Sequence, residues 1–158
     1  KGEEFIPTIL SEIDTIEQLH KKRNTEYAIR IHASGDFYSM PYMIDWLTIM
    51  KQRPDVQFYA YTKSIALWER LKRERLKRSH DIPANFTLIY SMGSNHDLAI
   101  DTEVDRHARI FQSEQDAIDA GYTLASEDDT QAWSVSNNKI GLVIFGATNR
   151  WKQAQVNK

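Results

Sequence analysis

The chain has 158 residues, 41% of them hydrophobic and 27% charged, which suits one globular domain with an ordinary core and argues against disorder. It contains no cysteine, so this chain itself forms no disulfide framework, thiolate nucleophile or cysteine-bound zinc or iron–sulfur centre. The net charge of −2 at pH 7 is small, and no run of about 18 apolar residues predicts a membrane span.

The start of the sequence, KGEEFIPTILSEID, does not have the pattern of a signal peptide. Because it begins with Lys1 rather than Met, we expect a processed, tagged or trimmed product with room for a segment upstream.

The first half of the chain predicts an alternation of helices and strands. Apolar residues recur at helical spacing from Ile6 to Leu19 and indicate an amphipathic helix. Ser39 suits the N-cap of a second helix, which has Pro41 in its first turn. Runs of β-branched and aromatic residues predict strands. The expected order is helix 8–22, strand 27–33, a helix from 40, strand 56–61, a helix from 65 and strand 86–90.

The second half is less regular. We expect a short strand over 108–111, a short helix that begins after Ser113 and ends near Gly121, and a strand over 140–145. The strand–helix–strand order favours parallel pairing through right-handed crossovers. The sequence therefore predicts a single α/β domain over residues 1–158, with a mainly parallel sheet and βαβ crossovers, either a partial (β/α)-barrel or doubly wound.

Three of the predicted strands end in short polar clusters. In an α/β sheet the carboxyl ends of parallel strands meet at one edge, and ligands usually bind there. We therefore predict a shared site at these strand ends. Its candidate residues are His32, Ser34, Gly35, Asp36, Thr62, Lys63, Ser64, Ser91, Gly93 and Ser94.

His32, Ser34 and Asp36 alternate along an extended segment and share one face of it. Same-face neighbours in a strand are about 7 Å apart, which is too far for a hydrogen-bonded Ser–His–Asp triad. We instead predict that His32 and Asp36 act as acid/base or ligand-contacting groups, while Ser34 and Gly35 let a ligand approach the backbone. The alternative is a buried histidine followed by an ordinary Ser-Gly-Asp turn.

Thr62, Lys63 and Ser64 lie between a strand and a helix. Exposed N–H groups at the start of that helix, with a lysine beside them, suit a phosphate or carboxylate. The spacing is not that of a P-loop. The alternative is an ordinary helix cap next to a solvent-exposed lysine.

Three further groups of polar or aromatic residues are candidates for contact with a ligand or a metal ion. Tyr59 and Tyr61 share a face, so they either pack in the core or flank a planar ligand. The run 127–129 is either solvated or places one carboxylate on a cation or a ligand hydroxyl. His96 and Asp97 follow the glycine turn, but the linear spacing of histidines and carboxylates matches no metal motif, and we expect no metal site.

Charge is distributed unevenly along the chain. Residues 68–80 hold six Lys/Arg against two Glu, whereas residues 96–129 hold ten Asp/Glu against two Arg. A basic helix suits nucleic acid or phosphate, but the overall pI of 6.2 favours a solvated helix face. An acidic face is able to bind a basic protein, either by charge complementarity alone or by mimicking nucleic acid.

The segment RIHASGDFYSMPYMIDWLTIMKQRPDVQFYAYTKS at 30–64 resembles the bacteriophage family called gene product 88. The resemblance continues through NFTLIYSMGS at 85–94, RHARIFQS at 106–113 and KIGLVIFG at 139–146, so it covers most of the chain. It implies a phage or prophage origin and a cytoplasmic setting in the bacterial host, without an established activity.

The sequence departs from the family pattern in two places. Family members resemble one another in a cysteine-rich segment before the SGD motif, which suggests metal or cluster ligation, and this chain has no cysteine. That segment is either lost or lies outside the present sequence. The final strand of the family tends to carry a histidine before the glycine, where this sequence has Phe145. Both departures weaken a catalytic interpretation.

We therefore predict a phage-encoded intracellular domain that binds a small anionic ligand, such as a nucleotide or phosphorylated metabolite, at its strand ends, with catalysis retained or lost. The alternative is a non-catalytic phage protein that binds or inhibits a host macromolecule, such as a host protein, through its acidic face. Neither nucleic-acid nor membrane binding is expected, and the sequence leaves open whether the domain uses a cofactor.

Overall fold

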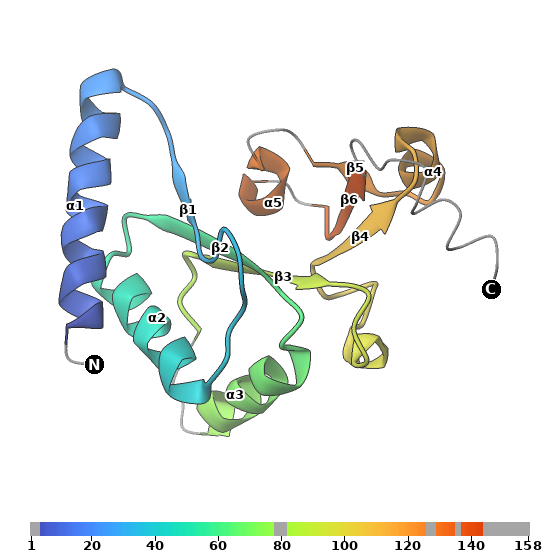
Figure 1. Ribbon diagram of the computed structural model, residues 1–158, viewed down its shortest axis with the longest axis horizontal. Helices are drawn as coiled ribbons and strands as arrows, with labels where there is room; N and C mark the ends of the chain where they lie inside the picture. Colours follow the sequence, from blue (N-terminus) through green and yellow to red (C-terminus); the bar gives the residue numbers. More distant parts are fainter. Residues whose placement is uncertain (1–3, 78–81, 126–128, 135–136, 144–158) are drawn as a thin grey trace.

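The described part of the chain folds around a six-stranded, all-parallel sheet that curls into a half-barrel (Figure 1). The computed structural model describes residues 4–77, 82–125, 129–134 and 137–143. The sheet has the order β1-β2-β3-β4-β6-β5, which confirms the predicted α/β class with parallel pairing. Its strands are β1 (Ala28–Arg30), β2 (Gln57–Thr62), β3 (Phe86–Ser91), β4 (His107–Phe111), β5 (Thr123–Leu124) and β6 (Lys139–Val143).

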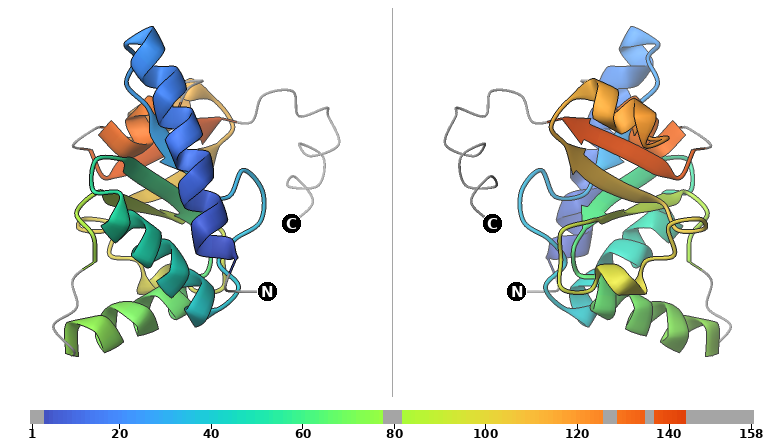
Figure 2. Two further views of the ribbon diagram at one scale, coloured as in Figure 1. Left: turned by 90° about the vertical axis from the view of Figure 1, so that its left-hand side faces the viewer. Right: turned by 90° about the vertical axis from the view of Figure 1, so that its right-hand side faces the viewer.

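Three helices cover the outer, convex face of the first three strands (Figures 1 and 2). They are α1 (Phe5–Arg23), α2 (Met40–Gln52) and α3 (Ile65–Lys77). Leu47 of α2 and Trp68 of α3 are buried in one cluster with Phe58 of β2. Full burial of such a side chain contributes about 1.5–3 kcal/mol relative to exposure, so this layer is the main core of the described residues.

The concave face of the sheet carries a second, smaller core. Side chains of β2 alternate between the two faces, so Phe58 and Ala60 meet the helices while Tyr59 faces the concave side. There Tyr59 and Ile89 pack with Ala132, the fully buried residue of α5 (Thr130–Ser134). Figure 1 shows α5 inside the curl of the sheet, on the side away from α2 and α3.

The position of α5 follows from the order of the last strands. From β1 to β4 each new strand is added on the same side of its predecessor, which keeps right-handed crossovers on one face. After α4 (Glu114–Asp119) the chain forms β5 at the sheet edge, and β6 then returns between β4 and β5. A right-handed crossover in this reverse direction requires its helix on the opposite face.

Neighbouring residues of β6 mark the two faces. A Cβ atom built on Gly141 would lie 3.0 Å from Cβ of Ala117 in α4, whereas Ile140 packs with Ala132 of α5. The glycine therefore allows α4 to pack closely on the sheet.

Most predicted elements are confirmed. Ser39 caps α2 by accepting a hydrogen bond from the Tyr42 N–H, and Ser113 caps α4 in the same way. The strand predicted over 27–33 ends at Arg30, because His32 has a left-handed φ of 63° that a strand does not accommodate. The strand predicted over 140–145 begins at Lys139, and residues 144 and 145 lie outside the described residues.

Three short elements were not predicted: β5, α5 and the 3-10 helix η1 (Asp97–Ala99). None of the described helices is long and apolar enough to cross a membrane.

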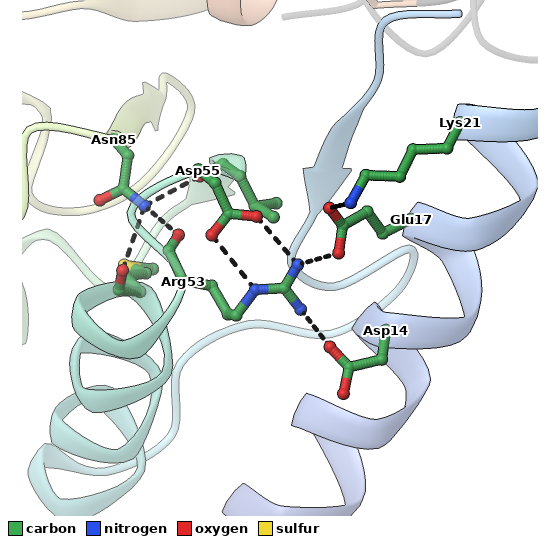
Figure 3. Close-up of polar contacts among 8 residues, drawn as sticks. Asp14, Glu17, Lys21, Arg53, Asp55 and Asn85 are labelled. Carbon is green, nitrogen blue, oxygen red and sulfur yellow. Dashed lines mark hydrogen bonds and ion pairs between the residues drawn. The ribbon is translucent and has the colours of Figure 1, made fainter. Parts of the chain in front are cut away.

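Arg53 joins α1 to the turn between α2 and β2 (Figure 3). Its side chain is 12% exposed, and its Nη1 and Nη2 atoms each lie 2.8 Å from a carboxylate oxygen of α1, on Asp14 and Glu17 respectively. Nε and Nη2 also donate to the two carboxylate oxygens of Asp55, at 3.2 and 3.0 Å. Beside this cluster, the Asn85 side chain donates to the carbonyl groups that end α2. These contacts fix the amino-terminal end of β2 against the helical layer.

Candidate functional site

The first two polar clusters are joined by hydrogen bonds to Asp36. Its Oδ1 accepts from Thr62 Oγ1 at 2.6 Å and from the Phe37 N–H at 2.7 Å, and its Oδ2 accepts from the Lys63 N–H at 2.6 Å. Thr62 is almost fully buried, at 1% exposure. The loop after β1 is thus held against the carboxyl end of β2, as the sequence predicts for neighbouring parallel strands.

Ser64 completes this connection. Its N–H donates to Thr62 Oγ1 at 3.0 Å, and its hydroxyl donates to the Phe37 carbonyl at 2.7 Å. Because Ser64 immediately precedes α3, the same contacts also fix the start of that helix. The side chains of Asp36, Thr62 and Ser64 are therefore occupied with one another and with backbone.

The third cluster is organised by Asp97. Its carboxylate accepts from the Gly93 N–H at 2.8 Å, and from the N–H and hydroxyl of Ser94, each at 2.9 Å. Partial burial opposes ionisation, but the donors of Gly93 and Ser94, with the nearby charge of Lys63, hold the pKa of Asp97 below its ordinary value. The sequence places Asp97 beside His96 after the glycine turn, but it does not predict that Asp97 accepts hydrogen bonds from that turn.

Lys63 links the second cluster to the third. A Cβ atom built on Gly93 would lie 3.7 Å from Lys63 Nζ, so the ammonium group is close to the glycine turn. Gly93 has a φ of 97°, which favours glycine at this position. Lys63 itself is exposed. Its ammonium group is therefore a positive charge that solvent reaches, at the place where the loops after β2 and β3 meet.

His32 lies at the base of the first loop. Its Nε2 atom is 3.0 Å from the hydroxyl of Tyr42 in α2, and its ring meets that of Phe37 edge-on at 4.7 Å between centroids. Nδ1 is buried and has no hydrogen-bond partner among the described residues. Burial lowers the pKa of His32, and the opposing effect of Asp36 is smaller, so the ring is neutral at pH 7.

The remaining predicted residues are placed without contacts that define a role. Ser34 and Gly35 are exposed in the loop after β1, and open space surrounds the position of a Cβ atom on Gly35. Ser91 is half-buried at the last position of β3. The structure thus joins Asp36, Thr62 and Ser64 directly and brings Lys63 beside Gly93.

One polar cluster on the concave face was not predicted as a unit. Arg30 Nη1 lies 2.8 Å from Oδ2 of Asp129, and the hydroxyl groups of Tyr59 and Tyr61 point at the same carboxylate. Of the run 127–129, Asp129 thus places its carboxylate on a cation, the guanidinium of Arg30. Residues 127 and 128 lie outside the described residues. Nothing in the sequence indicates Arg30 as its partner, because 99 residues separate the two.

Part of each charged stretch is engaged in contacts within the chain. In the acidic stretch, Asp101 and Asp105 accept backbone N–H groups of their own loop, and Glu103 pairs with Lys139. In the basic helix, Arg70 pairs with Glu74 and Lys72 with Glu69. Residues 78–80 of the basic stretch and 126–128 of the acidic one lie outside the described residues.

The other polar features lie away from the strand ends. Buried His107 is held between the Asp105 carbonyl and the Tyr122 hydroxyl, both at 2.9 Å. No group of three His, Asp or Glu side chains among the described residues is arranged to hold a metal ion. A cavity of about 440 Å³ lies near the opposite ends of β1 and β2, and Glu17, Tyr27 and Asp55 contribute to its lining.

Comparison with known proteins gives one consistent relationship. A family model described as Gene product 88 matches residues 1–157. The Gene 88 protein of Mycobacterium phage L5 is 43% identical over 42 residues, which are 27% of this chain and 18% of that protein. The Gene 88 protein of Mycobacterium phage D29 is 40% identical over 58 residues, which are 35% of this chain and 24% of that protein. The matched part thus spans less than a quarter of either relative, and no solved structure gives a significant match.

Proposed function

The chain belongs to the gene product 88 family, and we propose that it binds a small anionic ligand at the carboxyl ends of β1, β2 and β3. One observation carries the proposal: Lys63 donates its backbone N–H to Asp36, while its ammonium group lies beside Gly93. Three loops that are far apart in the sequence therefore meet around one exposed cation. The ligand class that suits this arrangement is a nucleotide or phosphorylated metabolite.

The residues of the site have different parts in this proposal. Lys63 supplies the charge that neutralises a phosphate, and exposed Ser34 and Gly35 border the approach. Asp36, with Thr62 and Ser64, positions the loops, because donors already occupy its carboxylate. Asp97 gives the turn at Gly93 and Ser94 its shape. Ser91 borders the same edge of the sheet.

His32 is the group suited to exchange a proton with such a ligand. It is neutral at pH 7, and its Nε2 atom lies 3.0 Å from the Tyr42 hydroxyl, through which it would exchange the proton, because its Nδ1 atom is buried. A neutral imidazole carries one donor and one acceptor nitrogen, so it is able to serve as acid or base. The binding proposal does not depend on catalysis.

The test is a thermal-shift screen of the chain with a panel of nucleotides and phosphorylated metabolites, followed by calorimetry for each compound that raises Tm. Lys63→Met is expected to weaken binding at least tenfold while leaving the Tm without ligand within about 1 °C, since an exposed side chain contributes little to stability.

Lys51→Met is the matched control, because Lys51 is an exposed lysine at the end of α2, away from the strand ends. Both variants lose one positive charge. Equal loss of affinity in the two variants would show that only net charge matters, and unchanged affinity in Lys63→Met would refute this site.

A further inference from the structure

Three hydrogen-bond donors of the sheet converge on a single carboxylate. Arg30, the last residue of β1, brings Nη1 to 2.8 Å from Oδ2 of Asp129. From β2, the Tyr59 hydroxyl donates to Oδ2 at 3.3 Å and the Tyr61 hydroxyl donates to Oδ1 at 3.4 Å. All three donors lie on the concave face, on two adjacent parallel strands, and Asp129 comes from a segment far away in the sequence.

The donors form a cradle that is set up for an anion. The guanidinium carbon of Arg30 lies 5.0 Å from the centre of the Tyr61 ring, so the cation is stacked over an aromatic face. Burial, followed by the charge of Asp129, raises the pKa of Tyr61, so its hydroxyl keeps its proton. The Arg30 side chain is 41% exposed, so a ligand arriving from solvent is able to reach it.

The cradle matches a carboxylate in particular. One oxygen of Asp129 faces the guanidinium and one phenol, and the other oxygen faces the second phenol. A carboxylate thus satisfies the three donors with its two oxygens. A contact between a guanidinium and a carboxylate is charge-assisted and stronger than a hydrogen bond between neutral groups.

The residue that fills the cradle has an unusual backbone conformation. Asp129 has a φ of 56°, in the left-handed region that is unfavourable for residues other than glycine, although Asp and Asn tolerate it best. It directly precedes α5, which has five residues. That helix is held by buried Ala132 and by Arg106, which donates to the Gln131 and Ala132 carbonyls.

We propose that Arg30, Tyr59 and Tyr61 form a binding site for the carboxylate group of a small ligand, and that Asp129 is its resident occupant, displaced when the ligand binds. In this arrangement Asp129 keeps the cradle satisfied without ligand and sets a threshold for binding, since the ligand has to compete with it. The proposal is independent of the Lys63 site, because the cradle uses other residues on the concave face.

The test replaces Asp129 with glycine and supplies the missing group from solution. Asp129→Gly removes the equivalent of one acetate ion and places glycine at a positive φ that suits it. Tm is measured in sodium acetate and in sodium chloride of equal ionic strength. Acetate is expected to raise the Tm of Asp129→Gly by about 3 °C more than that of the wild type, where Asp129 competes.

Two further variants separate the cradle from other anion sites. In Arg30→Gln/Asp129→Gly the acetate effect is expected to disappear, whereas in Lys63→Met/Asp129→Gly it persists. An acetate effect that survives the loss of Arg30, or that is no larger in Asp129→Gly than in the wild type, would overturn the proposal. An effect of inorganic phosphate equal to that of acetate would overturn the assignment to carboxylates.

If Asp129→Gly does not fold, Asp129→Asn serves in its place. The amide keeps the shape of the side chain but not its charge, so it competes less strongly for Arg30. Its acetate-dependent rise in Tm is expected to exceed that of the wild type. Equal responses of Asp129→Asn and the wild type would count against displacement.

Discussion

Asp36 and Thr62 are 26 residues apart in the chain and are joined by a hydrogen bond of 2.6 Å, in which the buried threonine hydroxyl donates to the carboxylate. The adjacent N–H of Lys63 donates to the other oxygen of the same carboxylate. The loop after β1 therefore takes its shape from the end of β2, and the exposed charge of Lys63 is positioned as a consequence.

Asp36→Asn is expected to destabilise the chain by about 2 kcal/mol. The substitution replaces one carboxylate oxygen with an NH₂ group, so either the Thr62 hydroxyl or the Lys63 N–H loses its acceptor and faces another donor. The free energy of unfolding from urea denaturation measures the loss. Thr62→Val in the same background is expected to cost less than in the wild type, since the two changes remove one shared interaction. Strict additivity of the two substitutions would show that the bond does not contribute.

His32 predicts a pH dependence. Its folded pKa is lowered by burial, so the unfolded chain binds more protons than the folded chain between the folded value and the ordinary value of 6.5. Stability is therefore expected to fall as the pH drops from 7 through 6.5 toward the folded pKa. His32→Asn, which tolerates the left-handed backbone, is expected to flatten this slope in urea denaturation at pH 5 to 7. The same slope in the variant would assign the effect to another group.

Arg53→Met is expected to destabilise the chain by about 2 kcal/mol, because it leaves three carboxylates near one another without their shared cation. Arg70→Met is the control, since Arg70 pairs with Glu74 on an exposed helix face and its loss is expected to cost less than about 0.5 kcal/mol. Similar losses in the two variants would contradict the role of Arg53 in joining α1 to β2.

The Arg53 cluster also responds to acid. The hydrogen bond from Arg53 outweighs burial and holds the pKa of Asp55 below its ordinary value of 3.8. The ionised Asp55 therefore stabilises the folded chain fully above pH 3.8, and this stabilisation is lost as the pH falls through the folded pKa. The difference in stability between wild type and Arg53→Met is expected to shrink below about pH 3.8. A difference that stays constant down to pH 2 would exclude an ionic origin.

Gly141→Ala tests the close packing of α4 on β6. The added methyl group would meet Cβ of Ala117 at 3.0 Å and Cβ of Tyr122 at 3.3 Å, so we expect a loss of about 1–3 kcal/mol. Ala117→Gly in the same chain removes the nearer of the two contacts and is expected to restore part of the loss. The free energies of unfolding of the single and double variants are measured by chemical denaturation. An unchanged stability of Gly141→Ala would contradict the close packing of α4 on the sheet.

The meeting of the polar strand ends was predictable because its signal is local. Polar clusters such as 32–36 and 62–64 directly follow apolar strands, and parallel pairing brings such ends together. The use of Asp36 as an acceptor for neighbouring loops was not predictable, because the sequence gives no geometry. The end of the first strand was misplaced for a related reason: the composition around His32 gives no signal for its left-handed φ.

The concave face was harder to predict. β5 has two residues and α5 has five, too few for any hydrophobic period to be recognised. Their places depend on β6 returning between β4 and β5, which is a property of the whole sheet. The pairing of Arg30 with Asp129 follows only after that arrangement is known.

The open half-barrel has a consequence for association between copies of the chain. A sheet that does not close leaves a strand at each edge, and exposed edges invite pairing with another molecule. Among the described residues the edge strands are β1, with three residues, and β5, with two, the shortest of the six. Each edge strand thus offers a neighbouring chain few backbone N–H and C=O groups. The sheet is open, but another molecule has little backbone with which to add a strand to it.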